Sequence, residues 1–123
     1  MPNKENIRKW VVALRSGEYQ QGHSTLYNAT NDTYCCLGVA CEVALANGIE
    51  LPKRMVGVRT FYNDNSADLP IKVVNWLGLT ANDPMLLTSS DDENTAIGLN
   101  DSKRYTFNHI ADAIERTYLN DRE

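Results

Sequence analysis

The chain has 123 residues, and its 12 basic and 16 acidic side chains give it a net charge of -4. This length, together with 42% hydrophobic residues, favours one soluble globular domain that spans residues 1–123. The charge is uneven, because residues 1–62 carry a net +2 and residues 63–123 a net -6. An acidic balance of this kind argues against sequence-independent binding to a nucleic-acid polymer, which needs clustered Lys and Arg.

Neither a membrane nor a secretory pathway is indicated. No apolar run approaches the roughly 18 residues that cross a bilayer, and the N-terminus has no secretory core. The cysteines are odd in number, namely Cys35, Cys36 and Cys41, so they imply no disulfide framework. We therefore expect reduced thiols and a cytoplasmic protein without membrane contacts.

The first predicted element is an amphipathic helix over residues 3–16. Its apolar residues recur at the spacing of one helical face, and Asn3 is suited to cap it. Residues 17–33 are rich in Gly, Asn, Thr and Ser, and they predict a long loop or an irregular hairpin. Long loops inside compact domains often carry function.

A buried central helix is predicted over residues 34–47, which are mostly small and apolar. Its expected N-cap is Asp32 or Thr33, and Gly38 would allow close backbone approach. The β-branched and aromatic stretch 55–62 then predicts one strand that closes into a turn. Pro70 opens a short helix that is expected to end at Gly78.

Residues 85–87 and 95–99 predict two short strands around a polar loop at 89–94, whose acidic run 91–93 is expected to be solvated. The last element is an amphipathic helix that begins after its cap, Thr106, and runs to about Leu119. The sum is a single α+β domain. It has amphipathic helices at both termini and a buried central helix packed with a small antiparallel sheet.

Two of the cysteines lie at the predicted N-terminus of the central helix. The helix dipole there favours a thiolate on Cys35 or Cys36, and His23 in the adjoining loop is a conceivable base. Free cysteine is nevertheless among the most buried residue types, so a structural role is expected and no catalytic residue is assigned. Cys36 and Cys41 are five residues apart with no second ligand pair, and we predict neither a metal site nor a cofactor.

The polar loop offers groups that recognise nucleotides, although it lacks both the G-x-G-x-x-G and the P-loop pattern. A guanidinium, aromatic faces and side-chain amides can hold a phosphate, stack a base and read its edge. The pair Asn100–Asp101 either closes an Asx turn or faces a ribose or base. The candidate ligand-binding residues are Arg15, Tyr19, Gln21, Tyr34, Arg59, Asn100 and Asp101.

Several residue blocks follow one another in a distinctive order. They are Trp10…Leu14-Arg15-Ser16-Gly17, then Tyr34-Cys35-Cys36-Leu37-Gly38-Val39-x-Cys41, then Trp76-Leu77-Gly78-Leu79, then Leu99-Asn100-Asp101…Thr106-Phe107…Ile110-Ala111-Asp112. Over nearly the whole chain this order resembles a family of small, mostly uncharacterised proteins of tailed bacteriophages and prophages. The resemblance implies a phage accessory protein that acts in the host bacterial cytoplasm, and it implies no catalytic residues.

Three functional hypotheses follow. The leading one is a counter-defence protein that sequesters a nucleotide immune signal, either a cyclic oligonucleotide or a cyclic ADP-ribose derivative, without catalysis and as a homo-oligomer. The second is an acidic protein-binding inhibitor or DNA mimic of a host defence enzyme, for which a net charge of -4 is modest. The third is a cysteine-dependent hydrolase or transferase that uses Cys35 or Cys36 with His23.

Overall fold

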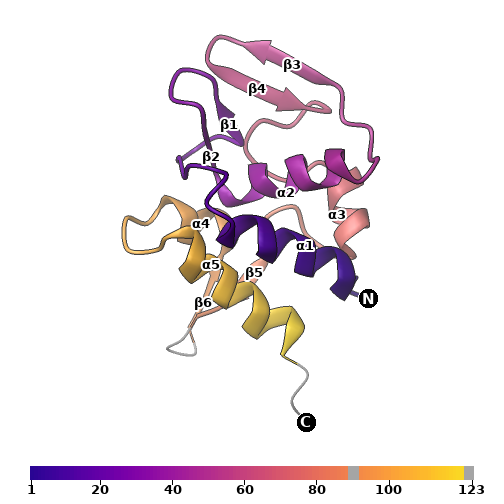
Figure 1. Cartoon of the computed structure of the whole chain (residues 1–123), viewed down its shortest axis with the longest axis vertical. Helices are drawn as coiled ribbons and strands as arrows, with labels where there is room; N and C mark the ends of the chain where they lie inside the picture. Colours follow the sequence, from indigo (N-terminus) through magenta and orange to yellow (C-terminus); the bar gives the residue numbers. More distant parts are fainter. Residues whose placement is uncertain (89–91, 121–123) are drawn as a thin grey trace.

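Helices and two antiparallel sheets make up the α+β fold of residues 1–88 and 92–120, which are the part of the chain that the computed structural model describes (Figure 1). The elements in chain order are α1 (Lys4–Arg15), β1 (Tyr27–Asn28), β2 (Thr33–Tyr34), α2 (Cys36–Ala46), β3 (Lys53–Val56), β4 (Arg59–Tyr62), α3 (Ile71–Leu77), β5 (Met85–Leu87), β6 (Glu93–Thr95), α4 (Ala96–Asp101), α5 (Phe107–Ile114) and the π-helical η1 (Glu115–Leu119). One sheet has the order β2-β1-β4-β3, and the other pairs β5 with β6. The predicted fold class is confirmed.

The two terminal helices form as predicted, and α1 lies between α5 and the central helix α2 and packs on both (Figure 1). In α1 the side chain of Asn3 accepts a hydrogen bond from the backbone N–H of Asn6, and the predicted apolar face is buried. In α5 a capping box joins Thr106 and His109. The chain then continues as the π-helical η1, which ends at Leu119, where the sequence predicts the end of the last helix.

The central helix α2 is buried as predicted, but its predicted cap is wrong. Thr33 and Tyr34 pair with β1 as strand β2, which keeps the backbone extended as far as Cys35. Cys35 is therefore the N-cap, and its Sγ accepts from the N–H of Gly38. The close approach predicted at Gly38 is confirmed, because a Cβ there would overlap the carbonyl group of Leu26.

The stretch 55–62 is a hairpin and not the single strand that the sequence predicts. Gly57 has a φ of +64° and, with Val58, forms a two-residue loop that pairs Val56 with Arg59. A left-handed residue at the first loop position is what two-residue hairpins require, and glycine adopts it without strain. For residues 17–33 the sequence predicts a long loop or an irregular hairpin, and β1 does pair with β2 as a hairpin, which extends to Tyr34. This hairpin joins the same sheet because Asn28 pairs with Arg59.

The second predicted strand of this half lies earlier in the chain than expected. Helix α3 ends at Gly78 as predicted, and β5 pairs with β6, but β6 is Glu93–Thr95, two residues of which were predicted as loop. Residues 96–101 form the helix α4 and not a strand. Its cap is Thr95, whose side chain accepts from the N–H of Gly98. Asn100 and Asp101 consequently lie in a helix and not in an Asx turn. Residues 89–91 of the predicted polar loop lie outside the described residues. Within the described residues, each helix is too short or too polar to span a bilayer.

Candidate functional site

The polar loop and the Asn100–Asp101 pair meet in the structure. The Nε2 atom of Gln21 donates to Oδ1 of Asn100 at 3.2 Å and to the carbonyl oxygen of Tyr105 at 3.1 Å. Asp101 accepts through Oδ1 from the N–H of Ser24 at 3.0 Å. Three candidate residues are thus brought together, and they bond to the protein itself.

Asn100 is the centre of this contact and is completely buried. Its Nδ2 donates to the carbonyl oxygen of Gly22 at 2.8 Å, and its Oδ1 accepts from the N–H of Cys36 at 3.0 Å. Next to it, Gly22 donates its N–H to the carbonyl oxygen of Tyr34 at 2.7 Å, while Tyr34 donates to Gln20 at 2.8 Å. Both backbone groups of Tyr34 are therefore held by residues 20–22.

The ring of Tyr34 contacts the rings of Tyr19 and Tyr27, and we call these three residues the tyrosine surface. The ring centroids of Tyr19 and Tyr34 are 5.1 Å apart with the rings nearly perpendicular, at 89°. Tyr27 and Tyr34 are 4.7 Å apart and tilted by 42°. All three are partly exposed, so a planar ligand can contact them. Tyr19 and Tyr34 belong to the candidate set, and Tyr27 does not.

Two carboxylates adjoin the tyrosine surface: Asp32, which accepts from the hydroxyl of Tyr27 at 2.8 Å, and Glu42. Glu42 is the single charged residue of α2, and its side chain is 19% exposed. Its Oε2 accepts from Nζ of Lys53 at 2.9 Å and from the hydroxyl of Tyr62 at 2.6 Å. Both of these partners use Oε2, so within the described part of the chain Oε1 is left available. A lone acid in an otherwise apolar helix is the sequence signal that would have found it.

The charge of Glu42 reaches all three tyrosines. Burial and then this carboxylate raise the pKa of Tyr34 to about 12. The pKa of Tyr19 is raised by the same two causes in the same order. The pKa of Tyr27 is raised mainly by its hydrogen bond to Asp32. The phenols therefore stay neutral at physiological pH and can donate hydrogen bonds.

The two candidate arginines lie elsewhere. Side chains alternate between the faces of a strand, so Arg59 and its partner Asn28 share the face opposite to that of Tyr27. Arg15 instead pairs with Asp112 at 2.8 Å and with Glu115 at 2.7 Å. Its two partners line a groove of about 610 Å³ between α1 and the C-terminal helix, which Arg8 and Arg116 also line. The structure thus divides the candidate set among three places.

The thiols are buried. Burial raises the pKa of Cys35 to about 11 and holds those of Cys36 and Cys41 well above the usual value. Cys35 borders a cavity of about 270 Å³ that Ser24, Thr25 and Asp101 also line. All three thiols are therefore protonated at neutral pH, whereas nucleophilic attack requires a thiolate. Among the described residues no three His, Cys, Asp or Glu side chains cluster as metal ligands would.

The chain matches one family model over residues 3–118, and that family is described as a domain of unknown function, DUF8296. No curated protein and no solved structure matches the chain.

Proposed function

The chain belongs to the DUF8296 family, and we propose that it binds a small nucleotide-type ligand on the tyrosine surface and sequesters it without catalysis. The observation that carries this proposal is the contact of Tyr34 with two further tyrosine rings on a backbone that Asn100 holds in place. The resemblance to phage proteins suggests the setting, which is counter-defence in the bacterial cytoplasm. The ligand class is a cyclic oligonucleotide or a cyclic ADP-ribose derivative.

The rings supply the stacking part of the recognition. Every nucleobase has a flat face, and stacking on an aromatic side chain contributes about 1–3 kcal/mol per base. Tyrosine loses little conformational entropy on binding because only two side-chain torsions need to be ordered. A partly exposed ring that is already held by its neighbours, as Tyr34 is, loses still less.

Glu42 supplies a means of reading the base edge. Its Oε1, which is unused within the described part of the chain, is an acceptor for the ring N–H and amino groups that nucleobases carry. A charged acceptor makes a stronger hydrogen bond than a neutral one. Lys53 offsets the negative charge at Oε2, which reduces the repulsion of an anionic ligand. The neutral hydroxyl of Tyr34 adds a donor suited to phosphate or ribose oxygens.

The thiols support a binding role over a cysteine enzyme. A nucleophile must be exposed and ionised, whereas Cys36 is completely buried and Cys35 nearly so. The exposed His23 lies in the adjoining loop, and no hydrogen bond joins it to either thiol in the described structure.

Thermal unfolding with a panel of cyclic di- and trinucleotides and ADP-ribose derivatives tests the proposal. A ligand at about 100 times its Kd adds about 2.7 kcal/mol to the free energy of unfolding, which raises the Tm by several degrees. The ligand should be recovered intact after the protein is denatured. No shift with any member of the panel would refute the proposal, and recovery of a cleaved ligand would favour the enzyme.

Two variants place the site. Tyr34→Leu should abolish the Tm shift because it removes the central ring, and Glu42→Gln should weaken binding most for bases with ring N–H donors. Tyr105→Leu is the matched control, since that ring contacts His109 and not the tyrosine surface. Equal loss of the shift in Tyr105→Leu and Tyr34→Leu would mean that the ligand binds elsewhere.

A further inference from the structure

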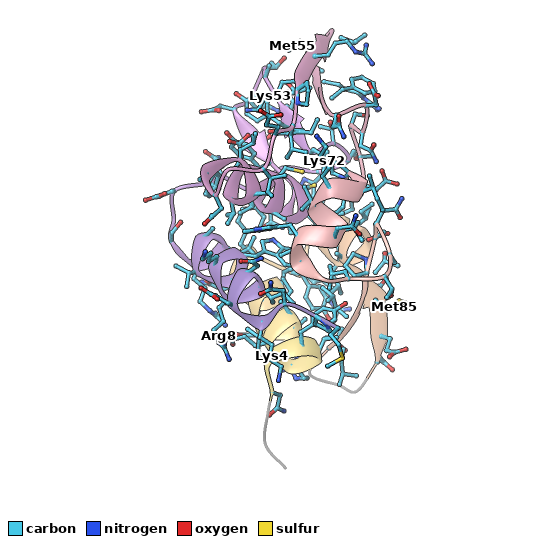
Figure 2. All side chains as sticks on the ribbon, turned by 90° about the vertical axis from the view of Figure 1, so that its right-hand side faces the viewer. Lys4, Arg8, Lys53, Met55, Lys72 and Met85 are labelled. Atoms are coloured by element: carbon cyan, nitrogen blue, oxygen red, sulfur yellow. The ribbon has the colours of Figure 1, made fainter. Side chains whose placement is uncertain are left out.

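The hairpin of β3 and β4, residues 53–62, carries apolar side chains into solvent. It projects at the end of the molecule away from α5, with Met55 near its tip (Figures 1 and 2). Met55, Val56 and Val58 are 60%, 52% and 47% exposed. Single exposed apolar residues are ordinary, but three within four positions are not, and alternation puts Met55 on one face of the hairpin and Val56 on the other.

The backbone of the same hairpin has an open edge. β3 is the last strand of its sheet, and in the described structure it pairs with β4 alone. The two-residue loop makes Val56 and Arg59 a hydrogen-bonded pair, so alternation turns the N–H and C=O groups of Met55 and Lys53 outward. Such an edge is a template for one more strand.

The charged residues of the hairpin are all basic. Lys53, Arg54 and Arg59 are the charged side chains of residues 53–62, in a chain that is acidic overall. Arg54 lies 4.6 Å from the ring centroid of Phe61, which orders its guanidinium and leaves the N–H edge free to meet a carboxylate. The register places Arg54, Val56 and Arg59 on one face, opposite to the face of Lys53.

We propose that β3 binds an acidic protein segment in extended conformation, which adds to the sheet as a fifth strand. Its backbone pairs with Lys53 and Met55, its acidic side chains meet Arg54 and Arg59, and its apolar side chains cover Met55. A second copy of this chain is a poorer occupant, because self-pairing would set the basic residues of the two β3 strands beside one another. This edge uses none of the three rings of the tyrosine surface, although Lys53 also pairs with Glu42 beside that surface.

The experiment uses the full chain and a fluorescein-labelled peptide of alternating Glu and Val, about eight residues long as ordinary strands are. Fluorescence anisotropy should show saturable binding that weakens as salt is added. A Lys/Val peptide and a Glu/Val peptide interrupted by proline should not bind. Equal binding of the proline-containing peptide would overturn strand addition.

Variants of the hairpin test the two halves of the proposal separately. The double variant Arg54→Glu and Arg59→Glu should bind the Glu/Val peptide about tenfold or more weakly than the wild type. It should also gain binding to the Lys/Val peptide. Arg8→Glu with Arg104→Glu makes the same charge change at exposed positions elsewhere and should leave binding unaltered. Met55→Pro removes an outward N–H and spares the β3–β4 bonds, so it should abolish binding in a folded protein.

Hydrogen exchange supplies a readout that surface charge alone would not move. The amides of Lys53 and Met55 should become protected when the Glu/Val peptide is added, and unchanged exchange there would refute strand addition. If the protein alone sediments as a dimer and Met55→Pro sediments as a monomer, the edge binds a second copy of this chain. Binding to phosphatidylserine vesicles without any binding to the peptide would assign it to a membrane surface, and either result overturns the proposal.

Discussion

The side-chain oxygen of Asn100 accepts a hydrogen bond from the backbone N–H of Cys36 at 3.0 Å, across 64 positions of the chain. The first N–H groups of a helix have no partner within the helix. In α2 one of them is served by this distant amide, and another is served by the thiol of Cys35, which accepts from Gly38. The start of the central helix therefore depends on a residue of α4.

Replacing Asn100 should destabilise the protein strongly. Asn100→Ala leaves the N–H of Cys36 and the carbonyl of Gly22 buried without their partner, and each such group costs about 1–3 kcal/mol. We expect a loss of about 3 kcal/mol or more in the free energy of unfolding, measured with urea. Asn75→Ala, on the exposed side of α3, is the control and should change little. A loss below about 1 kcal/mol in Asn100→Ala would contradict this role.

A methyl group at Gly38 should be more harmful than one at Gly48. The Cβ of Gly38→Ala would overlap the carbonyl group of Leu26, a buried residue whose N–H is bonded to Ser66. We expect this variant to lose about 3 kcal/mol or more. Gly48→Ala meets no atom within 4 Å and bears only the strain of a φ of +93°, about 1–2 kcal/mol. Equal midpoints of urea unfolding for the two variants would show that α2 and Leu26 are not in close contact.

The thiols should resist modification in the folded state. All three cysteines are free and buried, and burial raises each pKa, so few thiolates form near neutral pH. DTNB should react slowly with the native protein and should titrate three thiols promptly in guanidinium chloride. Rapid native reaction that is lost in Cys35→Ala would revive the hypothesis of a cysteine enzyme.

Stability should fall at alkaline pH, in part through Tyr34. Its pKa of about 12 lies above the value near 10 of an unfolded tyrosine, so the folded state binds the proton more tightly. The resulting stabilisation is complete below about pH 10 and disappears as the pH rises from about 10 to about 12. Urea unfolding across this window should show a shallower fall in Tyr34→Phe than in the wild type. Cys35 titrates in an overlapping range in both proteins, so only the difference between them reports on Tyr34.

Local patterns were sufficient for most of the helices. The face and cap of α1, the stop of α3 at Gly78 and the cap of α5 are set by residues within a turn or two of each other, and all are confirmed. The errors arose where a neighbouring segment decides the local structure. Cys35 caps α2 because pairing with β1 keeps Thr33 and Tyr34 extended. The loop at Gly57 interrupts a stretch that is β-prone throughout, so residue type alone did not reveal it.

The candidate site was only partly predictable for the same reason. The sequence placed Tyr19 and Gln21 in one polar loop, and in the structure Tyr19 contacts Tyr34 and Gln21 bonds to Asn100. It did not show how β1 and β4 pair, and this pairing places Arg59 on the face of the sheet opposite to that of Tyr27. Nor did it show that α2 brings Glu42 to Tyr62 and Lys53.

By itself the sequence determined an α+β fold with terminal amphipathic helices and a buried, cysteine-bearing central helix. Periodicity, capping and hydrophobic burial are properties of short segments, which is why they could be read directly. Only the tertiary structure decided that Asn100 supports the start of α2, that the tyrosines share a surface with Glu42, and that β3 is an open, basic edge. These relationships join residues tens of positions apart, and strand alternation and long-range packing set them.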